Sequence, residues 1–504
     1  MKKYILTIVS LVLLLSACDF SDINPESDLT YNGFWDTEEA ARAAHIGIYA
    51  KYRTYARTFW SMGEVRSDIW GGLTTETPND IELINNDISK TKVYFNNWGN
   101  LYGLLHNVND FITNASKITF KNENEKNHLL AQIYGIRAHI YYTMLRAWGD
   151  VPITTEPLID TNVEKLKKPR SPKAEVMQQV KADIAKSLEL FGEDNSLWLN
   201  KNIYWSKAAT LALKGDVYLW SGKVLGGGQA DFQEAKNALQ SISGFELVDY
   251  ENLWGEKNEN NKEFIFAFDY QQDQAGNFYS MFTGRIVDFN GLFDENGISA
   301  KDKSLLGDGS SVITGGASRF GPTDKILSLL DDKNDNRKNT FIRLYNDNKG
   351  HTPFTPEDPS YRTSVLNKFL GTIYDDGQRK DFNNIPLYRY ADVLLMLAEA
   401  KNNLNEDPSA EINAVRERAY GDNFVQYKFT KGSQADNQKA ILDERLKEFV
   451  GEGKRWWDLV RAGDGIVFKE VTSLKESEAY KIYYSISEGM IANDSELTQT
   501  EGYN

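Results

Sequence analysis

The chain has 504 residues, 41% of them hydrophobic and 26% charged, a composition typical of a globular protein. Its 57 lysines and arginines against 72 aspartates and glutamates give a formal net charge of −15. Because a nucleic-acid backbone needs neutralising cations, this balance argues against nucleic acid as a partner. The chain contains a single cysteine, so an internal disulfide framework is excluded and the fold must be stable through its core.

The N-terminus has the pattern of a bacterial lipoprotein signal. Lys2 and Lys3 precede a mostly apolar run over 5–15, shorter than the about 20 residues that a membrane span requires. The "LSAC" that follows fits a lipobox, which makes Cys18 the lipidated first residue of the mature chain. The alternative is a plain cleaved signal with an incidental cysteine. Lipidation predicts anchoring at a membrane surface, since several acyl chains hold far more firmly than one.

The lipobox also divides the chain. Residues 1–17 are predicted to be the signal peptide, and the acidic stretch 18–30 lacks core character and is typical of a tether. Residues 31–504 are predicted to form a single domain, with a loop-rich insert at about 250–385.

Two long amphipathic helices are expected next along the chain. Residues 128–148 place apolar side chains at helical spacing, and Gly149 ends the pattern. Arg137 falls inside this apolar stripe, so we expect a carboxylate or carbonyl partner for it, most simply as a buried clamp between helices. Residues 171–191 give a second amphipathic helix.

Further helices come in pairs, 205–223 with 231–242 and 390–404 with 410–420. Small residues at close-approach positions make them similar to the helix-turn-helix units of tetratricopeptide repeats. Their spacing is irregular, which indicates a degenerate scaffold and not a tandem array. The predicted fold class is therefore mostly α, an irregular scaffold of tetratricopeptide-like helical pairs with a loop-rich portion that carries a few short strands.

The loop-rich portion has its own patterns. "KEFIFAFDY" (262–270) alternates like a short strand, and glycine-rich loops follow it. Residues 331–341 faintly resemble a calcium loop, but Arg337 and Arg343 stand where its glycine and its bidentate glutamate should be, so a solvated loop is expected. Long irregular segments in a helical body usually carry function.

Signatures of catalysis are absent from the sequence. It has no HExxH, GxSxG, Walker loop or CxxC pair, and its five histidines show no metal-ligand spacing. The 72 carboxylates leave open a pair at glycosidase distance, a separation that sequence does not show, so enzyme activity is unsupported. We expect a non-enzyme without catalytic residues, metal or cofactor.

Aromatic residues outside the helical stripes are the candidates for ligand binding. In "MGEVRSDIWGGLTTETPND" (62–80) we expect Trp70 to expose its ring beside the carboxylate of Asp68, next to two glycines. Carbohydrate sites pair a flat ring for the C–H face of a sugar with polar groups for its hydroxyls. Tyr279, Phe282 and Arg362 are expected to complete the site.

Trp456 and Trp457 stand side by side among basic residues near the C-terminus, which suits either a binding surface or a core. A helical stripe over 441–449 ends at Gly451 and Gly453, after which the two tryptophans are expected to fold back and cover it.

Several stretches together resemble the SusD/RagB family of outer-membrane lipoproteins of Bacteroidetes. They are, besides the lipobox, "GFWDTEEAARAAHIGIY", "NNWGNLYGLLHNVNDFI", "RAHIYYTMLRAWGDVPI", "IPLYRYADVLLMLAEA" and "ILDERLKEFVGEGKRWWDLVR". The resemblance implies a scaffold of four helical pairs, in which the tryptophan-rich stretch is structural, and a glycan site made by loops.

The same resemblance implies the setting. A SusC-like TonB-dependent outer-membrane transporter would be the partner, with this protein as a lid over its barrel, lipid-anchored at the outer membrane and facing the exterior. The ligand would be an oligosaccharide or polysaccharide, and the alternative is a peptide or another non-glycan nutrient, as in the RagB branch. Family members differ most in their glycan-contacting loops, so the resemblance does not identify the sugar.

Overall fold

The computed structural model of the protein describes residues 31–503 except 76, 79, 93, 161, 285–286, 303–304, 306–315, 317, 370 and 375–378. Cys18 and the predicted tether lie outside the described residues. No helix in the described part of the chain is both long and apolar enough to cross a membrane.

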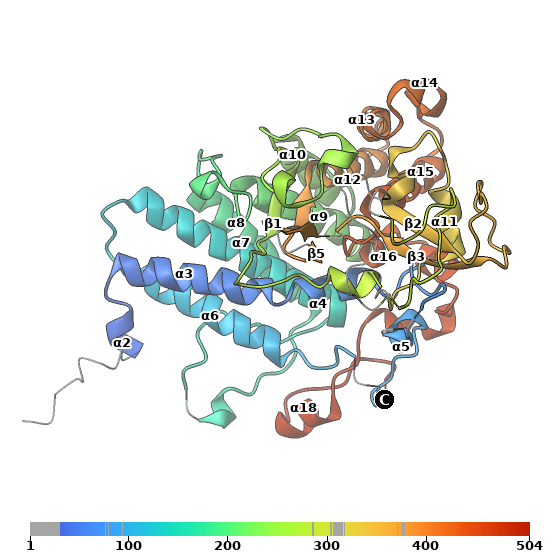
Figure 1. Cartoon of the computed structure of the whole chain (residues 1–504). Helices are drawn as coiled ribbons and strands as arrows, with labels where there is room; N and C mark the ends of the chain where they lie inside the picture. Colours follow the sequence, from blue (N-terminus) through green and yellow to red (C-terminus); the bar gives the residue numbers. More distant parts are fainter. Residues whose placement is uncertain are drawn as a thin grey trace, which may run out of the picture.

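Helices make up most of the described chain, as the sequence predicts (Figure 1). The α-helices are α2 (Tyr31–Phe34), α3 (Glu38–Arg53), α4 (Ala56–Glu64), α5 (Ile81–Ile84), α6 (Gly99–Ala115), α7 (Glu123–Trp148), α8 (Lys173–Phe191), α9 (Lys207–Val224), α10 (Gly228–Gln240), α11 (Asp324–Leu329), α12 (Tyr390–Asn403), α13 (Ser409–Tyr420), α14 (Phe424–Tyr427), α15 (Gln434–Phe449), α16 (Arg455–Ala462), α17 (Ile466–Glu470) and α18 (Glu488–Asn493). The 3-10 turns are η1 (Val163–Lys165), η2 (Trp198–Asn200), η3 (Tyr250–Asn252), η4 (Glu256–Asn258), η5 (Tyr279–Phe282), η6 (Asn336–Thr340), η7 (Gly421–Asn423) and η8 (Glu476–Ile482).

The long helices pack in pairs. The pairs are α3 with α6, α7 with α8, α9 with α10, and α12 with α13, and each pair contacts the next through α6–α7, α8–α9 and α10–α12. Close packing requires small residues: a Cβ on Gly215 of α9 would lie 2.5 Å from the Leu239 side chain of α10. The tetratricopeptide-like scaffold predicted from the sequence is confirmed.

Helix α7 shows why the local predictions hold. It begins at Glu123, where the side chain of Asn122 caps it, and ends at Gly149, whose φ of +73° is strained for other residues. Arg137 lies within its buried face and makes a two-pronged ion pair with Asp183 of α8, at 2.9 and 2.7 Å. The expected carboxylate partner of Arg137 is therefore present.

The strands are few and short: β1 (Phe264–Phe268), β2 (Phe341–Tyr345), β3 (Tyr361–Leu366), β4 (Thr372–Ile373), β5 (Arg379–Lys380) and β6 (Ile385–Arg389). They form three antiparallel pairs, β1–β6, β2–β3 and β4–β5. The predicted strand in 262–270 is confirmed, but all five residues of β1 are buried, so its expected alternation is wrong. One face packs on the helical core, and Phe264 and Ala267 pack on a second apolar cluster around Leu253.

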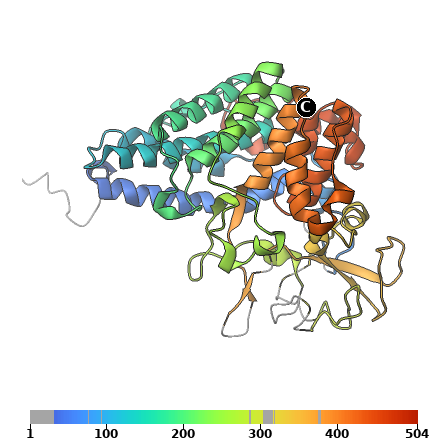
Figure 2. The ribbon, with the colours of Figure 1, turned by 90° about the horizontal axis from the view of Figure 1, so that it is seen from above.

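The segments between β1 and β6 project from one side of the helical body (Figure 2). They include the 331–341 stretch, for which the expectation of a solvated loop is wrong. Arg337 in η6 is fully buried and pairs with Asp335, Glu444 and Glu448 at 2.8, 2.7 and 3.1 Å. These carboxylates explain the composition of the stretch, because a buried guanidinium requires paired charges.

The tandem tryptophans belong to the scaffold, as the resemblance implies. Trp456 and Trp457 lie on α16 and are 0% and 5% exposed. The guanidinium carbon of Arg66, itself buried, lies 4.1 Å from the centre of the Trp456 ring. A binding surface built on these rings is excluded, because both are covered.

Candidate functional site

The structure brings four of the five predicted ligand-binding residues into one region. Trp70 and Phe282 have ring centres 5.1 Å apart, Tyr279 lies 5.3 Å from Phe282, and Asp68 is two residues from Trp70. The region joins α4 to η5 and to the loop after α15. Sequence reasoning therefore found residues that lie together, although they are far apart in the chain.

The expectation that Trp70 exposes its ring is wrong. The side chain is 2% exposed, its Nε1 donates to Glu64 at 3.2 Å, and the rings of Trp60, Phe320 and Phe341 surround it. The two following glycines explain the burial. A Cβ on Gly72 would lie 1.9 Å from the carbonyl oxygen of Pro322, so these glycines admit the segment that covers the ring.

The carboxylate of Asp68 is also buried and paired. Both its oxygens accept from the guanidinium of Arg455 at 2.8 Å, and Lys325 Nζ lies 2.5 Å away. Burial by itself would raise the pKa of Asp68, but the charges of Arg455 and Lys325 outweigh it and lower this pKa to about 2. The carboxylate joins α4, α11 and α16 and has both oxygens occupied.

Tyr279 and Phe282 complete this buried cluster, at 2% and 1% exposure. The Tyr279 hydroxyl donates to the carbonyl of Gly451, and its ring stacks on Phe369 with centres 4.1 Å apart. Glu64 lies beside them and accepts from the backbone N–H groups of Gly451 and Gly453, while burial raises its pKa to about 8. We call Asp68, Trp70, Tyr279, Phe282 and their ring neighbours the closed aromatic cluster.

Arg362 is the fifth predicted residue. It is half-buried on β3, and its Nη1 donates to the carbonyl of Thr74 at 3.1 Å. Its role in ligand binding stays a prediction.

An open hollow of about 250 Å³ lies between α4 with the residue before it, the segment that leads into the first turn of α6, and the last residue of α7. Its volume is just below the range of about 300–1,000 Å³ usual for small-molecule sites. It is lined by Tyr55, Thr58, Met62, Phe95, Asn96, Asn97, Asn100, Leu101 and Trp148. We call it the Phe95 hollow. Half-buried rings and exposed amides thus meet at one place on the surface.

Phe95 adopts an unusual backbone conformation. Its φ is +47°, in the left-handed region that a bulky L-residue rarely occupies. The surrounding structure holds it there: Trp148 Nε1 donates to the carbonyl of Phe95 at 2.8 Å, and the Tyr484 ring lies 5.5 Å from the Phe95 ring. Such strain concentrates at functional sites, because it persists only where neighbouring contacts maintain it.

The polar groups of the Phe95 hollow are arranged in advance. The Tyr55 hydroxyl donates to the backbone carbonyl of Asn100 at 2.7 Å. Asn97 is exposed, and its Oδ1 accepts from the N–H of Gly99 at 2.7 Å, which fixes the orientation of this side chain. Donors and acceptors beside a ring face suit the hydroxyls and C–H face of a sugar.

One sequence signal points to these residues. "VYFNNWGN" places Tyr94, Phe95 and two asparagines just before a helix, outside any helical stripe. The same criterion that selected Trp70 applies to it. The two stretches differ in burial, because Trp70 is buried and Phe95 is half-buried. Segments distant in the chain decide that difference.

Titratable clusters elsewhere do not suggest a metal. Among the described residues, no group of three or more histidines, cysteines or carboxylates is arranged to hold an ion. His351 lies between Asp347 and Asp358, each 2.8 Å away, and against the Tyr345 ring at 4.0 Å. These contacts order the loop between β2 and β3. Burial by itself would lower the pKa of His351, but the hydrogen bonds to Asp347 and Asp358 outweigh it and raise this pKa, which favours the imidazolium that can donate to both.

Two family profiles match the sequence. One, described as "SusD family", covers residues 250–503, and another, described as "Starch-binding associating with outer membrane", covers 19–219. Together they span most of the chain.

Known proteins resemble the whole chain. The solved structure of NanU from B. fragilis is 33% identical, with a TM-score of 0.83, covering 96% of this chain and 100% of that one. "SusD-like protein P38" of Formosa agariphila is 26% identical over 92% of this chain and 93% of its own. A "Laminarin binding SusD-like protein" shares the fold, with a TM-score of 0.72 at 20% identity, covering 93% of this chain and 100% of that one.

Proposed function

The chain belongs to the SusD family, and we propose that it is a non-catalytic cell-surface protein that binds a glycan and delivers it to a SusC-like TonB-dependent transporter. The Phe95 hollow carries the proposal. Its described lining consists of aromatic, amide, hydroxyl and apolar side chains and includes no carboxylate, histidine, cysteine, lysine or arginine. Such a lining can hold a sugar but offers no strong general acid, base or nucleophile.

The relatives support a glycan as the ligand. One family profile is described as starch-binding, one structural neighbour as laminarin-binding, and one curated relative as a starch-binding protein. We place the ligand at the Phe95 hollow and not at the closed aromatic cluster, because only the hollow presents ring faces to solvent.

Weak binding is expected at such a site. A sugar hydroxyl exchanges water for a protein partner with a net gain of only about 0.5–1.5 kcal/mol, so ring stacking must supply much of the preference. One or two ring faces and two amides would give a Kd between about 1 mM and 1 μM. Weak binding also suits a protein that passes its ligand onward.

Calorimetry with plant, fungal and host oligosaccharides tests the proposal. Phe95→Ala should weaken the binding of at least one glycan by about tenfold or more and leave the circular dichroism spectrum unchanged. Phe245→Ala is a matched control, since Phe245 is also half-buried but does not line the hollow, and it should bind as the unaltered protein does. Equal glycan affinity of the two variants would contradict the assignment of the hollow.

Two other outcomes would redirect the function. Binding of peptides, with no glycan bound, would favour the RagB-like alternative. Release of reducing sugar from a bound polysaccharide would reveal a hydrolase.

The partner and the anchor have separate tests. A lid over a transporter must bury a surface of the order of 2,000 Å² or more, so co-purification in mild detergent should recover a TonB-dependent transporter. Cys18→Ala should release the protein from membranes. A variant that still sediments with membranes and incorporates palmitate would show that Cys18 is not the anchor.

A further inference from the structure

A second and larger depression lies on the other half of the molecule. It is a groove of about 760 Å³ between η3, η6, the end of β3 and the segment before β6. Its volume falls within the range usual for ligand sites, about 300–1,000 Å³. No residue of the Phe95 hollow lines it. We call it the Trp254 groove.

The wall of the Trp254 groove is aromatic. Trp254 is half-buried, and its ring centre lies 4.8 Å from that of Phe369 and 6.0 Å from that of Tyr250, both in edge-to-face geometry. The Tyr250 hydroxyl hydrogen-bonds Thr340 at 3.0 Å, which connects η3 to η6. The ring of Trp254 is therefore held rigidly at the edge of the cavity, as a stacking surface requires.

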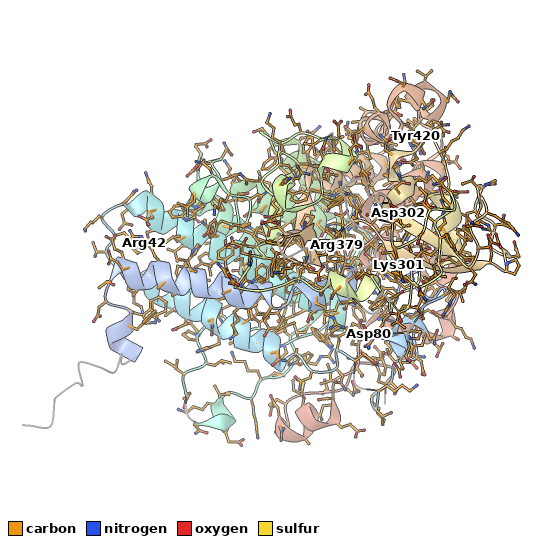
Figure 3. The ribbon with its side chains drawn as sticks, in the orientation of Figure 1. Arg42, Asp80, Lys301, Asp302, Arg379 and Tyr420 are labelled. Carbon is orange, nitrogen blue, oxygen red and sulfur yellow. The ribbon has the colours of Figure 1, made fainter. Side chains whose placement is uncertain are left out.

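Amides surround that wall. Asn336, Asn339 and Asn367 line the groove, and Asn367 Nδ2 donates to the carbonyl of Asn339 at 3.1 Å. Arg379 of β5, labelled in Figure 3, donates from Nη1 to the carbonyl of Gly371 at 2.8 Å. These hydrogen bonds join the separate loops into a single preformed lining.

The buried lysine of the groove, Lys368, already has its hydrogen-bond partners. Lys368 is 1% exposed and its Nζ donates to the carbonyls of Glu448 and Val450 and to Glu452, at 2.7, 2.9 and 2.6 Å. The same Nζ lies 5.0 Å from the centre of the Trp254 ring. Lys368 therefore fixes the floor and does not call for an anionic ligand.

Two side chains of the lining have buried polar atoms without a hydrogen-bond partner among the described residues. Asn383 is 3% exposed, yet within the described part of the chain neither its Oδ1 nor its Nδ2 has a hydrogen-bond partner. The indole Nε1 of Trp254 is likewise buried and unpaired among the described residues. Burying a polar group without a partner costs free energy, so such groups in a cavity lining indicate a ligand.

The neighbouring residue Asn384, unlike Asn383, has a hydrogen-bond partner for its side chain among the described residues. It is buried to a similar degree, at 6% exposure, but its Oδ1 accepts from the N–H of Tyr270 at 2.7 Å. Two adjacent asparagines thus share chemistry and burial, and only the one that lines the groove is unsatisfied.

We propose that the Trp254 groove is a second saccharide site, which takes an uncharged oligosaccharide stacked on Trp254 with hydroxyls paired to Asn383. A hydroxyl both donates and accepts, so vicinal hydroxyls can satisfy both atoms of the amide. A peptide fits less well, because the lining offers amides and charges but no apolar pocket for side chains. The inference does not depend on the Phe95 hollow, since the two sites share no lining residue.

Calorimetry with maltohexaose, laminarihexaose and mannohexaose tests the proposal on the full-length mature protein. At least one should bind a Phe95→Ala variant, and adding Asn383→Ala should weaken that binding about tenfold, the value of about one lost hydrogen-bond pair. The melting temperature of Asn383→Ala should be unchanged or higher, because no folded-state hydrogen bond is removed. A purely structural role for Asn383 would lower it.

Asn384→Ala is the matched control, and it should lower the melting temperature while oligosaccharide affinity is retained. Loss of all oligosaccharide binding in Phe95→Ala alone would overturn the second site and leave the proposed function intact. If oligosaccharide binding is lost in Asn383→Ala but kept in both Phe95→Ala and Asn384→Ala, the groove is supported. This holds even if the Phe95 hollow binds no glycan. Asn383-dependent binding of oligoalanine in place of every sugar would overturn the saccharide assignment.

Discussion

The closed aromatic cluster and the Phe95 hollow contain similar side chains and present them to opposite environments. Trp70 in the cluster is 2% exposed and hydrogen-bonded to a buried carboxylate, whereas Phe95 in the hollow is half-buried in a strained conformation. The difference comes from what lies over them. The segment around Pro322 passes close to Gly72 and covers Trp70, while the described chain leaves the Phe95 hollow open.

The contrast teaches that aromatic residues beside polar side chains have two opposite uses. In the cluster the Asp68 carboxylate neutralises Arg455 and Lys325, so the charge stabilises the interior. In the hollow the polar groups are uncharged amides, which cost little to expose and can exchange water for a ligand. In these two regions, therefore, the charged side chains belong to the packed interior, and the exposed amides of Asn97 and Asn100 line the open hollow.

The largest expected effect is on Trp70. Trp70→Ala should destabilise the protein by about 3–5 kcal/mol, because it leaves a cavity among four other rings. Urea unfolding followed by circular dichroism measures the change, with Phe95→Ala as the surface counterpart and an expected loss of about 1 kcal/mol. Similar losses for the two variants would erase the contrast between cluster and hollow.

The stability of the protein at low pH tests the charge of Asp68 in the closed aromatic cluster. The pKa of Asp68 is lowered from 3.8 to about 2, so its stabilising contribution is present above pH 4 and is lost as the pH falls through about 2. A shift of this size corresponds to about 2–3 kcal/mol. In urea unfolding between pH 5 and pH 2, Asp68→Asn should lose less stability than the unaltered protein. Parallel pH profiles would show that folding leaves the pKa of Asp68 unchanged.

Backbone strain in the hollow gives a smaller effect. Phe95→Gly should be about 1 kcal/mol more stable than Phe95→Ala, because both lack the ring and only alanine resists a φ of +47°. The pair is compared by urea unfolding at pH 7. Equal stability would mean that the backbone relaxes when the ring is removed, so the strain is imposed by the side chain.

The smallest effect concerns the rim of the hollow. Tyr55→Phe removes the hydroxyl that donates to the Asn100 carbonyl at 2.7 Å but keeps the ring. Because that bond is partly exposed to water, we expect a loss of about 0.5 kcal/mol and unchanged glycan affinity. Thermal unfolding and calorimetry check the two expectations, and a large loss of affinity would assign the hydroxyl itself to the ligand.

Much of the scaffold was predictable because its signals are local. The spacing of apolar residues over 128–148 and the glycine that follows predict α7 to its last residue, and the lone Arg137 in that stripe predicts its carboxylate partner. Helix formation and capping depend on residues within a few positions of one another, so a short window contains the information.

The site was less predictable because exposure is not local. Asp68, Trp70, Tyr279 and Phe282 were grouped correctly, yet the side on which they face was wrong, since Pro322 and Gly451 cover them from more than 150 residues away in the chain. The 331–341 stretch failed in the same way, because the carboxylates that bury Arg337 include two on α15.

The sequence by itself determined the helical periodicity, the caps, the pairing of helices and the resemblance to the SusD family. Each depends on residue type and short-range spacing. Only the tertiary structure decided which aromatic rings are core and which face solvent, and which of Asn383 and Asn384 is left without a partner. The physical reason is that burial and hydrogen-bond satisfaction are properties of contacts between distant segments, and no local pattern records where those segments meet.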